Sequence, residues 1–383
     1  MKLKVKKDKS FLEQLGVKYF QKLYSSSSAK EQITLSNIPS DKILEAISNV
    51  IVRNSTIIAF LVGALVTVPL VFFELFYYEK LPFFEYWWEY GILSLVSLII
   101  ELLILYLLTL HSIYALLHLI GEYPKKDNSI PEVYLIDRVL IRAALELEEP
   151  ILEFMGIDPQ KKLSKSELLL AGFLYKAKVV LTSFVAKKIL KVILPRLGAR
   201  GVVIPFVPVF VVAFWDAYVL NRSIKDAKLR LFGYYFSQYL VDEILTKKIL
   251  AKNPKLDIEG VIRAIASIVV LSKSNHPNNL ILLVRLDKYL DKEIEDPDSL
   301  EKYTQYLNNL SPKEKHYLRV LSTITAVLDK KITKEEKEGL SQIYQEKRSY
   351  YLDLLKKMKS LLSLGHIHEL ARLVQKEFEK DLF

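Results

Sequence analysis

TIIAFLVGALVTVPLVFFELFY, residues 56–77, is the stretch that decides the fold, and Glu74 is its one charged residue. An α-helix needs about 20 apolar residues to cross the hydrocarbon core of a bilayer, and this run is long enough to do so. A second apolar run, residues 91–120, also contains a single acid, Glu101. The two runs predict a hairpin of two transmembrane helices.

The segment between the two runs, residues 79–90, reads EKLPFFEYWWEY. Its Trp, Tyr and Phe rings are of the kind that settle at the lipid–water interface. Residues 74–90 hold four Glu and one Lys, whereas residues 1–54 hold ten Lys or Arg and five acids. The positive-inside rule therefore predicts that both ends of the hairpin, the N-terminus and the C-terminal domain lie in the cytoplasm.

Glu101 lies near the middle of the second run, where an ionisable side chain costs about 2.5–3.5 kcal/mol on insertion scales. It should therefore face the interior of the protein. Counting inward from the connecting segment places Thr67 opposite Glu101, with Gly63 one turn before it allowing the helices to approach. We expect Glu101 and Thr67 to form an intramembrane polar pair that holds the hairpin, or a homo-oligomer, together. A proton or ion relay through Glu101 is the alternative.

A third apolar segment, residues 201–220, is interrupted by Pro205 and Pro208 and has basic residues on both sides. A straight crossing would leave a basic cluster on the outer side. We therefore expect a membrane-associated segment that does not cross, in a re-entrant or interfacial helix. A buried core helix beginning near Pro208 is the alternative, because each Pro disfavours helix at the residue before it.

The net charge is concentrated around this third segment. Residues 161–230 hold 14 Lys or Arg and three acids, a local charge of +11 against +10 for the whole chain. Anionic lipid headgroups are the expected partners of such a block, and no nucleic-acid-binding motif accompanies it, so nucleic acid is not expected as a partner. The predicted lipid contacts are Lys187, Lys188, Lys191, Arg196, Arg200, Arg222, Lys225, Lys228 and Arg230.

The composition predicts an all-α protein. Only 12 Gly and 14 Pro occur in 383 residues, and long stretches rich in Leu, Ile, Lys and Glu favour helix. Cys is absent, which excludes disulfides, thiol catalysis and Cys-ligated metal centres. The predicted domains are a basic N-terminal segment with an amphipathic helix (1–54), the hairpin (55–121), a basic helical region (122–250) and a C-terminal helical domain (251–383).

Apolar residues at three- and four-residue spacing predict a series of helices in the C-terminal domain. Ser311 with Glu314, and Thr333 with Glu336, have the spacing of capping boxes, which mark helix starts. The predicted helices span residues 257–273, 278–293, 298–309, 312–329, 333–362 and 366–382. The N-terminal amphipathic helix, residues 10–24, is expected either at the membrane surface or packed on the cytoplasmic domain.

Two segments resemble known bacterial families. Residues 318–344, LRVLSTITAVLDKKITKEEKEGLSQIY, are similar to the central helix–loop–helix of TerB-like tellurite-resistance domains, and the matching positions are Asp329, Ile332, Glu335 and Glu336, with Lys330 in place of the family's Gly. Residues 197–236 resemble EcsC-like membrane-associated proteins. Both resemblances imply a bacterial, envelope-associated protein without a catalytic residue set. Together with the predicted hairpin, this gives the expectation of a multi-pass protein of the inner membrane.

No phosphate-binding loop and no zinc-protease or serine-hydrolase motif occurs in the sequence. His366, His368 and Glu369 could supply metal ligands, but alternate residues at a helix start face different directions, so a solvated helix start is favoured. We expect no metal, no cofactor and no catalytic residue.

The resulting functional hypothesis is a non-catalytic, membrane-anchored helical scaffold or stress-related adaptor whose C-terminal helices bind a protein partner. The alternative is an oligomeric ion or small-solute channel or transport component that uses Glu101. An enzyme acting on lipid at the membrane surface is a third hypothesis, which lacks a catalytic constellation.

Overall fold

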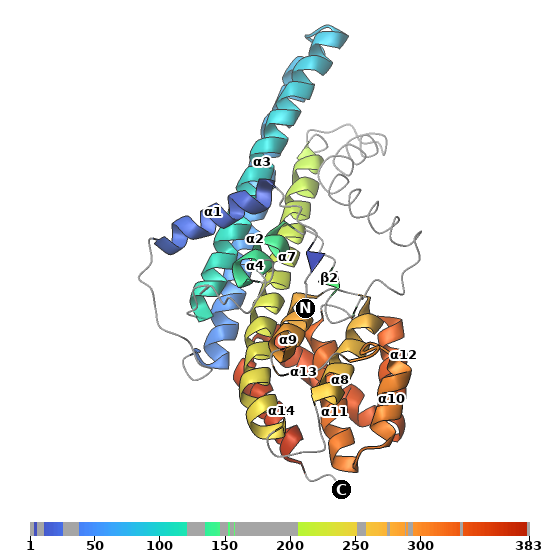
Figure 1. The fold of residues 1–383 in the computed structure, drawn as a ribbon. Coiled ribbons are helices and arrows are strands. Elements are labelled where there is room, and N and C mark those ends of the chain that lie inside the picture. Colours follow the sequence, from blue (N-terminus) through green and yellow to red (C-terminus); the bar gives the residue numbers. More distant parts are fainter. Residues whose placement is uncertain are drawn as a thin grey trace. The chain divides into compact units, whose positions relative to one another are not determined.

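The structure is a computed structural model, which describes residues 4–5, 11–25, 38–120, 135–145, 152–153, 157, 206–250, 258–273, 276–287, 289, 294–329 and 332–380. In these residues the regular structure is helical, apart from a two-residue antiparallel pairing of β1 (Lys4–Val5) with β2 (Leu152–Glu153) (Figure 1). The predicted all-α class is confirmed.

The chain forms two compact units that do not follow its linear order. The larger unit contains Met1–Ser48, Tyr114–Lys162 and Asp226–Phe383, and the second, which we call the apolar unit, contains Asn49–Ile113 and Leu163–Lys225. Three long helices therefore have residues in both units. The four consecutive domains expected from the sequence stay a prediction.

Two long helices dominate the apolar unit, α2 (Asp41–Tyr77) and α3 (Phe83–Ile120) (Figure 1). Within the part of the chain that the structure describes, they are the two helices long and apolar enough to cross a membrane. In their most apolar stretches only 22% and 17% of the residues are buried. The core helix of a soluble protein would bury most of that surface, so these helices differ from one.

The two helices pack in antiparallel directions as the candidate hairpin. Ser55 Oγ and Ser112 Oγ lie 2.7 Å apart near one end. Toward the turn, the rings of Phe73 and Tyr86 stack with centroids 5.9 Å apart. Between these two contacts, the Thr67 hydroxyl donates to the Gly63 carbonyl oxygen at 2.7 Å.

The third apolar segment forms the first half of a longer helix, α7 (Val207–Tyr239). Pro208 stands in its first turn, where a missing amide donor removes no intrahelical hydrogen bond. The predicted helix start near Pro208 therefore agrees with the structure, whereas residues 201–205 lie outside the described residues. α7 continues as a π-helix, η6 (Leu240–Leu250).

The first half of α7 packs antiparallel to α2 inside the apolar unit. The Phe60 and Phe214 rings meet edge to face at 5.2 Å, and Asn221 Nδ2 donates to Thr56 Oγ1 at 2.9 Å. Gly63 permits this approach, because a Cβ atom there would stand 3.0 Å from the Ala213 Cα atom. Such small-residue contacts are typical of helix packing in membranes.

The C-terminal helices of the larger unit surround one central helix, α11 (Pro312–Leu328), which packs against α8 and α13 and is buried along most of its length. Both predicted capping boxes are confirmed, at the starts of α11 and α12. The helices around α11 are α8 (Ile258–Ser272), α9 (Pro277–Asp287), α10 (Leu300–Asn308), α12 (Lys334–Tyr344), α13 (Arg348–Leu364) and α14 (Ile367–Glu379).

The single helix predicted over residues 333–362 is wrong, because the chain breaks after Tyr344. Gln345 has φ 52° and opens a short 3₁₀ turn, η7 (Gln345–Lys347), between α12 and α13. The side chain of Arg319 on α11 donates to the Ile343 carbonyl oxygen at 2.9 Å and to Gln345 Oε1 at 2.8 Å. The first of these bonds occupies a backbone carbonyl oxygen that a continuous helix would use in its own ladder.

The N-terminal amphipathic helix is confirmed as α1 (Phe11–Ser25), which packs on α4 (Ile136–Ala144) in the larger unit. Phe20 is fully buried, and Glu13 forms an ion pair with Arg142 at 3.0 Å. Of the two placements considered for this helix, packing on the protein is the one that the structure contains.

A buried carboxyl group caps the start of α12. Glu336 is 0% exposed, and its Oε2 accepts the Thr333 backbone N–H at 2.7 Å. Burial and the charge of Asp329 together raise the pKa of Glu336 to about 7, although the hydrogen bonds with Thr333 lower it. The folded protein therefore holds a proton here that the unfolded chain releases near pH 4.5.

We predict that replacing Glu336 by Gln flattens the pH dependence of stability. A raised carboxyl pKa means that stability falls as pH rises from about 4.5 through about 7, because the folded state binds more protons. The Gln variant keeps the capping acceptor without the charge, so at about pH 8 it should be more stable by about 2–3 kcal/mol. Hydrogen exchange of α11 and α12 amides in detergent or nanodiscs measures this.

Glu338 provides the control, because its side chain is 64% exposed on the same helix. Glu338→Gln should leave the pH dependence unchanged. An equal pH slope in Glu336→Gln and wild type would contradict the assignment.

Candidate functional site

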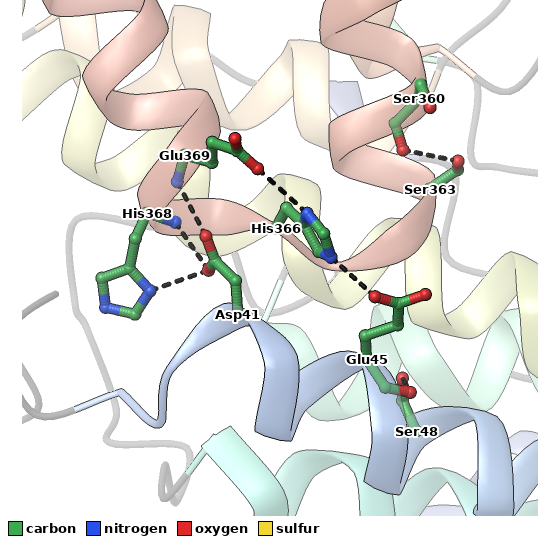
Figure 2. A network of polar contacts seen from close by, with 8 residues as sticks. All are labelled: Asp41, Glu45, Ser48, Ser360, Ser363, His366, His368 and Glu369. Carbon is green, nitrogen blue, oxygen red and sulfur yellow. Dashed lines mark hydrogen bonds and ion pairs between the residues drawn. The ribbon is translucent and has the colours of Figure 1, made fainter.

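The start of α2 meets the start of α14 within the larger unit (Figure 2). Asp41 Oδ1 accepts the backbone N–H of His368 at 3.0 Å, and Asp41 Oδ2 accepts that of Glu369 at 2.9 Å. The first amides of any helix lack intrahelical partners, and α14 has no side-chain cap of its own. Asp41 therefore caps a helix that begins more than 300 residues later in the chain.

Two imidazoles complete this contact. His366 lies between two carboxylates, with Nε2 2.8 Å from Glu45 Oε2 and Nδ1 3.1 Å from Glu369 Oε2. His368 Nδ1 lies 2.9 Å from Asp41 Oδ1. We call these five residues, Asp41, Glu45, His366, His368 and Glu369, the carboxylate–histidine junction.

The junction shifts the pKa of its own groups. Burial alone would raise the pKa of Asp41, but hydrogen bonds from the His368 side chain and from the His368 and Glu369 amides lower it below its ordinary value. Burial alone would lower the pKa of His366, but the hydrogen bonds with Glu45 and Glu369 raise it above 6.5. A protonated His366 can donate to both carboxylates at once.

These directions fix the pH range in which the junction stabilises the fold. The contribution of Asp41 is present above its unfolded pKa and is lost as pH falls through its lowered folded pKa. The contribution of His366 is complete below pH 6.5 and is lost as pH rises through its raised folded pKa. The junction is therefore strongest in mildly acidic solution and weakens on the alkaline side.

The sequence offered His366, His368 and Glu369 as metal ligands and favoured a solvated helix start. The structure places them against two carboxylates at the beginning of α2 instead. Among the residues described, no group of three or more His, Asp or Glu side chains is arranged to hold a metal ion. Nothing in the sequence showed that these residues pair with Asp41 and Glu45. A helix start that lacks its own capping side chain could have indicated an acceptor from another part of the chain.

The predicted intramembrane residues, Glu101 and Thr67, are both buried in the apolar unit, 4% and 8% exposed. The Ser55–Ser112 contact sets the register of α2 and α3. Thr67 lies twelve residues after Ser55 on α2, and Glu101 lies eleven residues before Ser112 on α3. The two side chains are therefore at the same level of the hairpin. The register agrees with the counting argument, and the polar contact between the two side chains stays a prediction.

The nine predicted lipid-contacting cations fall into two groups. Lys187, Lys188, Lys191, Arg196 and Arg200 lie outside the described residues. On α7, Lys225 is exposed and Arg222 is half-buried. Lys228 is buried, with Nζ 5.5 Å from the centre of the Phe232 ring, and Arg230 pairs with Asp226 at 3.2 Å. Contact with anionic lipid stays a prediction for the set.

Comparison of the chain with protein families, with curated proteins and with solved structures finds no match. The resemblances to TerB-like and EcsC-like proteins therefore stay predictions. Of the four TerB-like positions, Glu336 is fully buried, whereas Glu335 is 55% exposed and lies 3.6 Å from Lys273 Nζ.

We predict that Asp41→Ala loosens the start of α14. Loss of a carboxylate that caps two amides should lower the free energy of local opening there by about 1–2 kcal/mol. Hydrogen exchange of the first amides of α14 measures the effect. Asp353→Asn is the control, because Asp353 is 74% exposed and, in the described part of the chain, pairs with Lys356 on its own helix at 3.2 Å. Equal protection of α14 in Asp41→Ala and Asp353→Asn would contradict the capping role.

Proposed function

We propose that this chain is a non-catalytic scaffold or stress-related adaptor, anchored in a bacterial inner membrane by α2 and α3, with its N-terminus and C-terminal helices in the cytoplasm. The observation that carries the proposal is the large apolar surface of α2 and α3. Leu65 is 70% exposed and Ile99 is 57% exposed. Soluble monomers rarely expose contiguous apolar surface of this extent, and a bilayer would cover it.

The turn between α2 and α3 supports a membrane position. Phe84 and Trp88 are 85% and 72% exposed there, and aromatic rings are enriched at the membrane interface. The acids of this turn, together with the basic N-terminal segment, favour placing the turn outside and the helix ends in the cytoplasm.

The first half of α7 supports insertion of a third element beside the hairpin. Contacts with α2 run from Asn221 of α7, which bonds Thr56, to Phe206, the residue before α7, whose ring lies 5.9 Å from that of Phe72. This half of α7 therefore follows the apolar stretch of α2. Aromatic side chains with large exposed surfaces lie along it at four-residue spacing, namely Phe210, Phe214 and Tyr218. A re-entrant membrane helix would have this arrangement.

A second candidate function, ion or small-solute conduction by an oligomer, is favoured by the acids of the apolar unit. Glu101 and Asp216 are 4% and 5% exposed. Intramembrane ionisable residues often mark proton or ion pathways. Conduction by the purified protein in liposomes, abolished by Glu101→Gln, would support this candidate and contradict the scaffold.

Single-cysteine variants test the predicted topology, since the chain contains no Cys of its own. In inverted and right-side-out membrane vesicles, a membrane-impermeant maleimide should label Phe84→Cys from the outer side only. Ser341→Cys, on α12, should react from the cytoplasmic side only. Recovery of the chain in the soluble fraction, or labelling of both positions from the same side, would contradict the proposed anchoring.

A further inference from the structure

A groove lies between α12 and α13 in the larger unit, with a volume of about 840 Å³. Its floor includes the half-buried aliphatic side chains of Ile332 and Leu352, and the buried side chains of Leu340 and Leu355 also line it. Cationic side chains stand around that floor, and none of the described residues that line it carries a carboxylate. The four cations are Lys337, Arg348, Lys356 and Lys359.

The cations are only weakly neutralised by the protein. In the described part of the chain, the exposed side chains of Lys337 and Arg348 form no ion pair. Lys356 pairs with Asp353 at 3.2 Å, but both side chains are more than 70% exposed, and such surface pairs contribute little. Burial lowers the pKa of Lys359, although the charges of Asp329 and Glu336 raise it. An acidic ligand would therefore meet available positive charge.

The spacing of the cations selects the kind of ligand. Arg348, Lys356 and Lys359 lie along α13, and Lys359 is eleven residues after Arg348. At about 1.5 Å per residue, these cations are spread over about 16 Å. A lipid presents its charge in a single headgroup, whereas an acidic helix presents carboxylates at every turn. The apolar floor between the charged rims corresponds to the apolar stripe of such a helix.

We propose that the α12–α13 groove binds an acidic amphipathic helix of a protein partner. Leu-type side chains of the partner, three and four residues apart, pack on Ile332 and Leu352. Its Glu or Asp side chains pair with the cations of α12 and α13. The inference rests on the proposed adaptor function and assigns the surface and the charge of the partner.

The test uses the full chain in nanodiscs of phosphatidylcholine, a zwitterionic lipid, so that incorporation into the membrane is verified first. The probe is a fluorescein-labelled synthetic helix of 16 residues with Leu at heptad a and d positions and Glu at most others. Fluorescence anisotropy should show saturable binding that weakens with salt. The same peptide with Lys in place of Glu should not bind.

Two charge-reversing variants locate the binding. Lys337→Glu combined with Arg348→Glu should weaken binding at least tenfold, since it reverses two cations of the groove. Lys334→Glu is the control on the same helix, because its side chain is 88% exposed and does not line the groove. Hydrogen exchange of α12 and α13 verifies that each variant is folded, and the control should bind as wild type does.

Equal binding by wild type and the double variant would overturn the proposal, since general attraction to a basic chain would then explain the signal. The proposal would also be overturned if the double variant still bound the peptide but no longer bound phosphatidylglycerol vesicles. The groove would then be a lipid site. If the chain enters nanodiscs but does not bind the acidic peptide, the groove assignment is contradicted and the membrane anchoring is not. Failure to enter nanodiscs contradicts the anchoring itself.

Discussion

The constraint on which the rest of the structure depends is the large apolar surface that α2 and α3 leave exposed. Transferring apolar surface out of water is worth about 25 cal/mol per Å², and these helices bury little of theirs against the protein. Ser55 and Ser112 bond to each other inside the hairpin, and the Thr109 hydroxyl donates to the Leu105 carbonyl oxygen. Such internal pairing is what a hydrocarbon environment requires.

The same helix that carries this apolar surface begins in the larger unit, where Asp41 caps α14. The larger unit is assembled from distant parts of the chain. Within it, Asn278 on α9 donates to the Leu229 carbonyl oxygen of α7 at 3.3 Å. A fragment beginning at residue 251 would lose both contacts, so the C-terminal helices are stabilised by segments that precede and follow the hairpin. The carboxylate–histidine junction makes that stability depend on pH.

Features set by neighbouring residues were predictable from the sequence. The two apolar helices follow from their composition, and the capping boxes follow from Ser311 and Thr333 three residues before an acid. Features set by distant residues were not. The break at Gln345 depends on Arg319 from another helix, and the junction pairs Asp41 with amides 327 and 328 positions away. The α12–α13 groove likewise exists only because that break allows α13 to change direction, so no periodicity in the sequence could indicate it.

The central claim, that α2 and α3 lie in hydrocarbon, is tested most directly by spin-label accessibility in liposomes. Leu65→Cys and Ile99→Cys, introduced into the Cys-free chain and spin-labelled, should collide readily with oxygen and hardly at all with a water-soluble nickel chelate. Lys356→Cys on α13, whose native side chain is 78% exposed, serves as the aqueous reference and should show the opposite preference. Nickel accessibility at the two hairpin positions equal to that at position 356 would contradict the account.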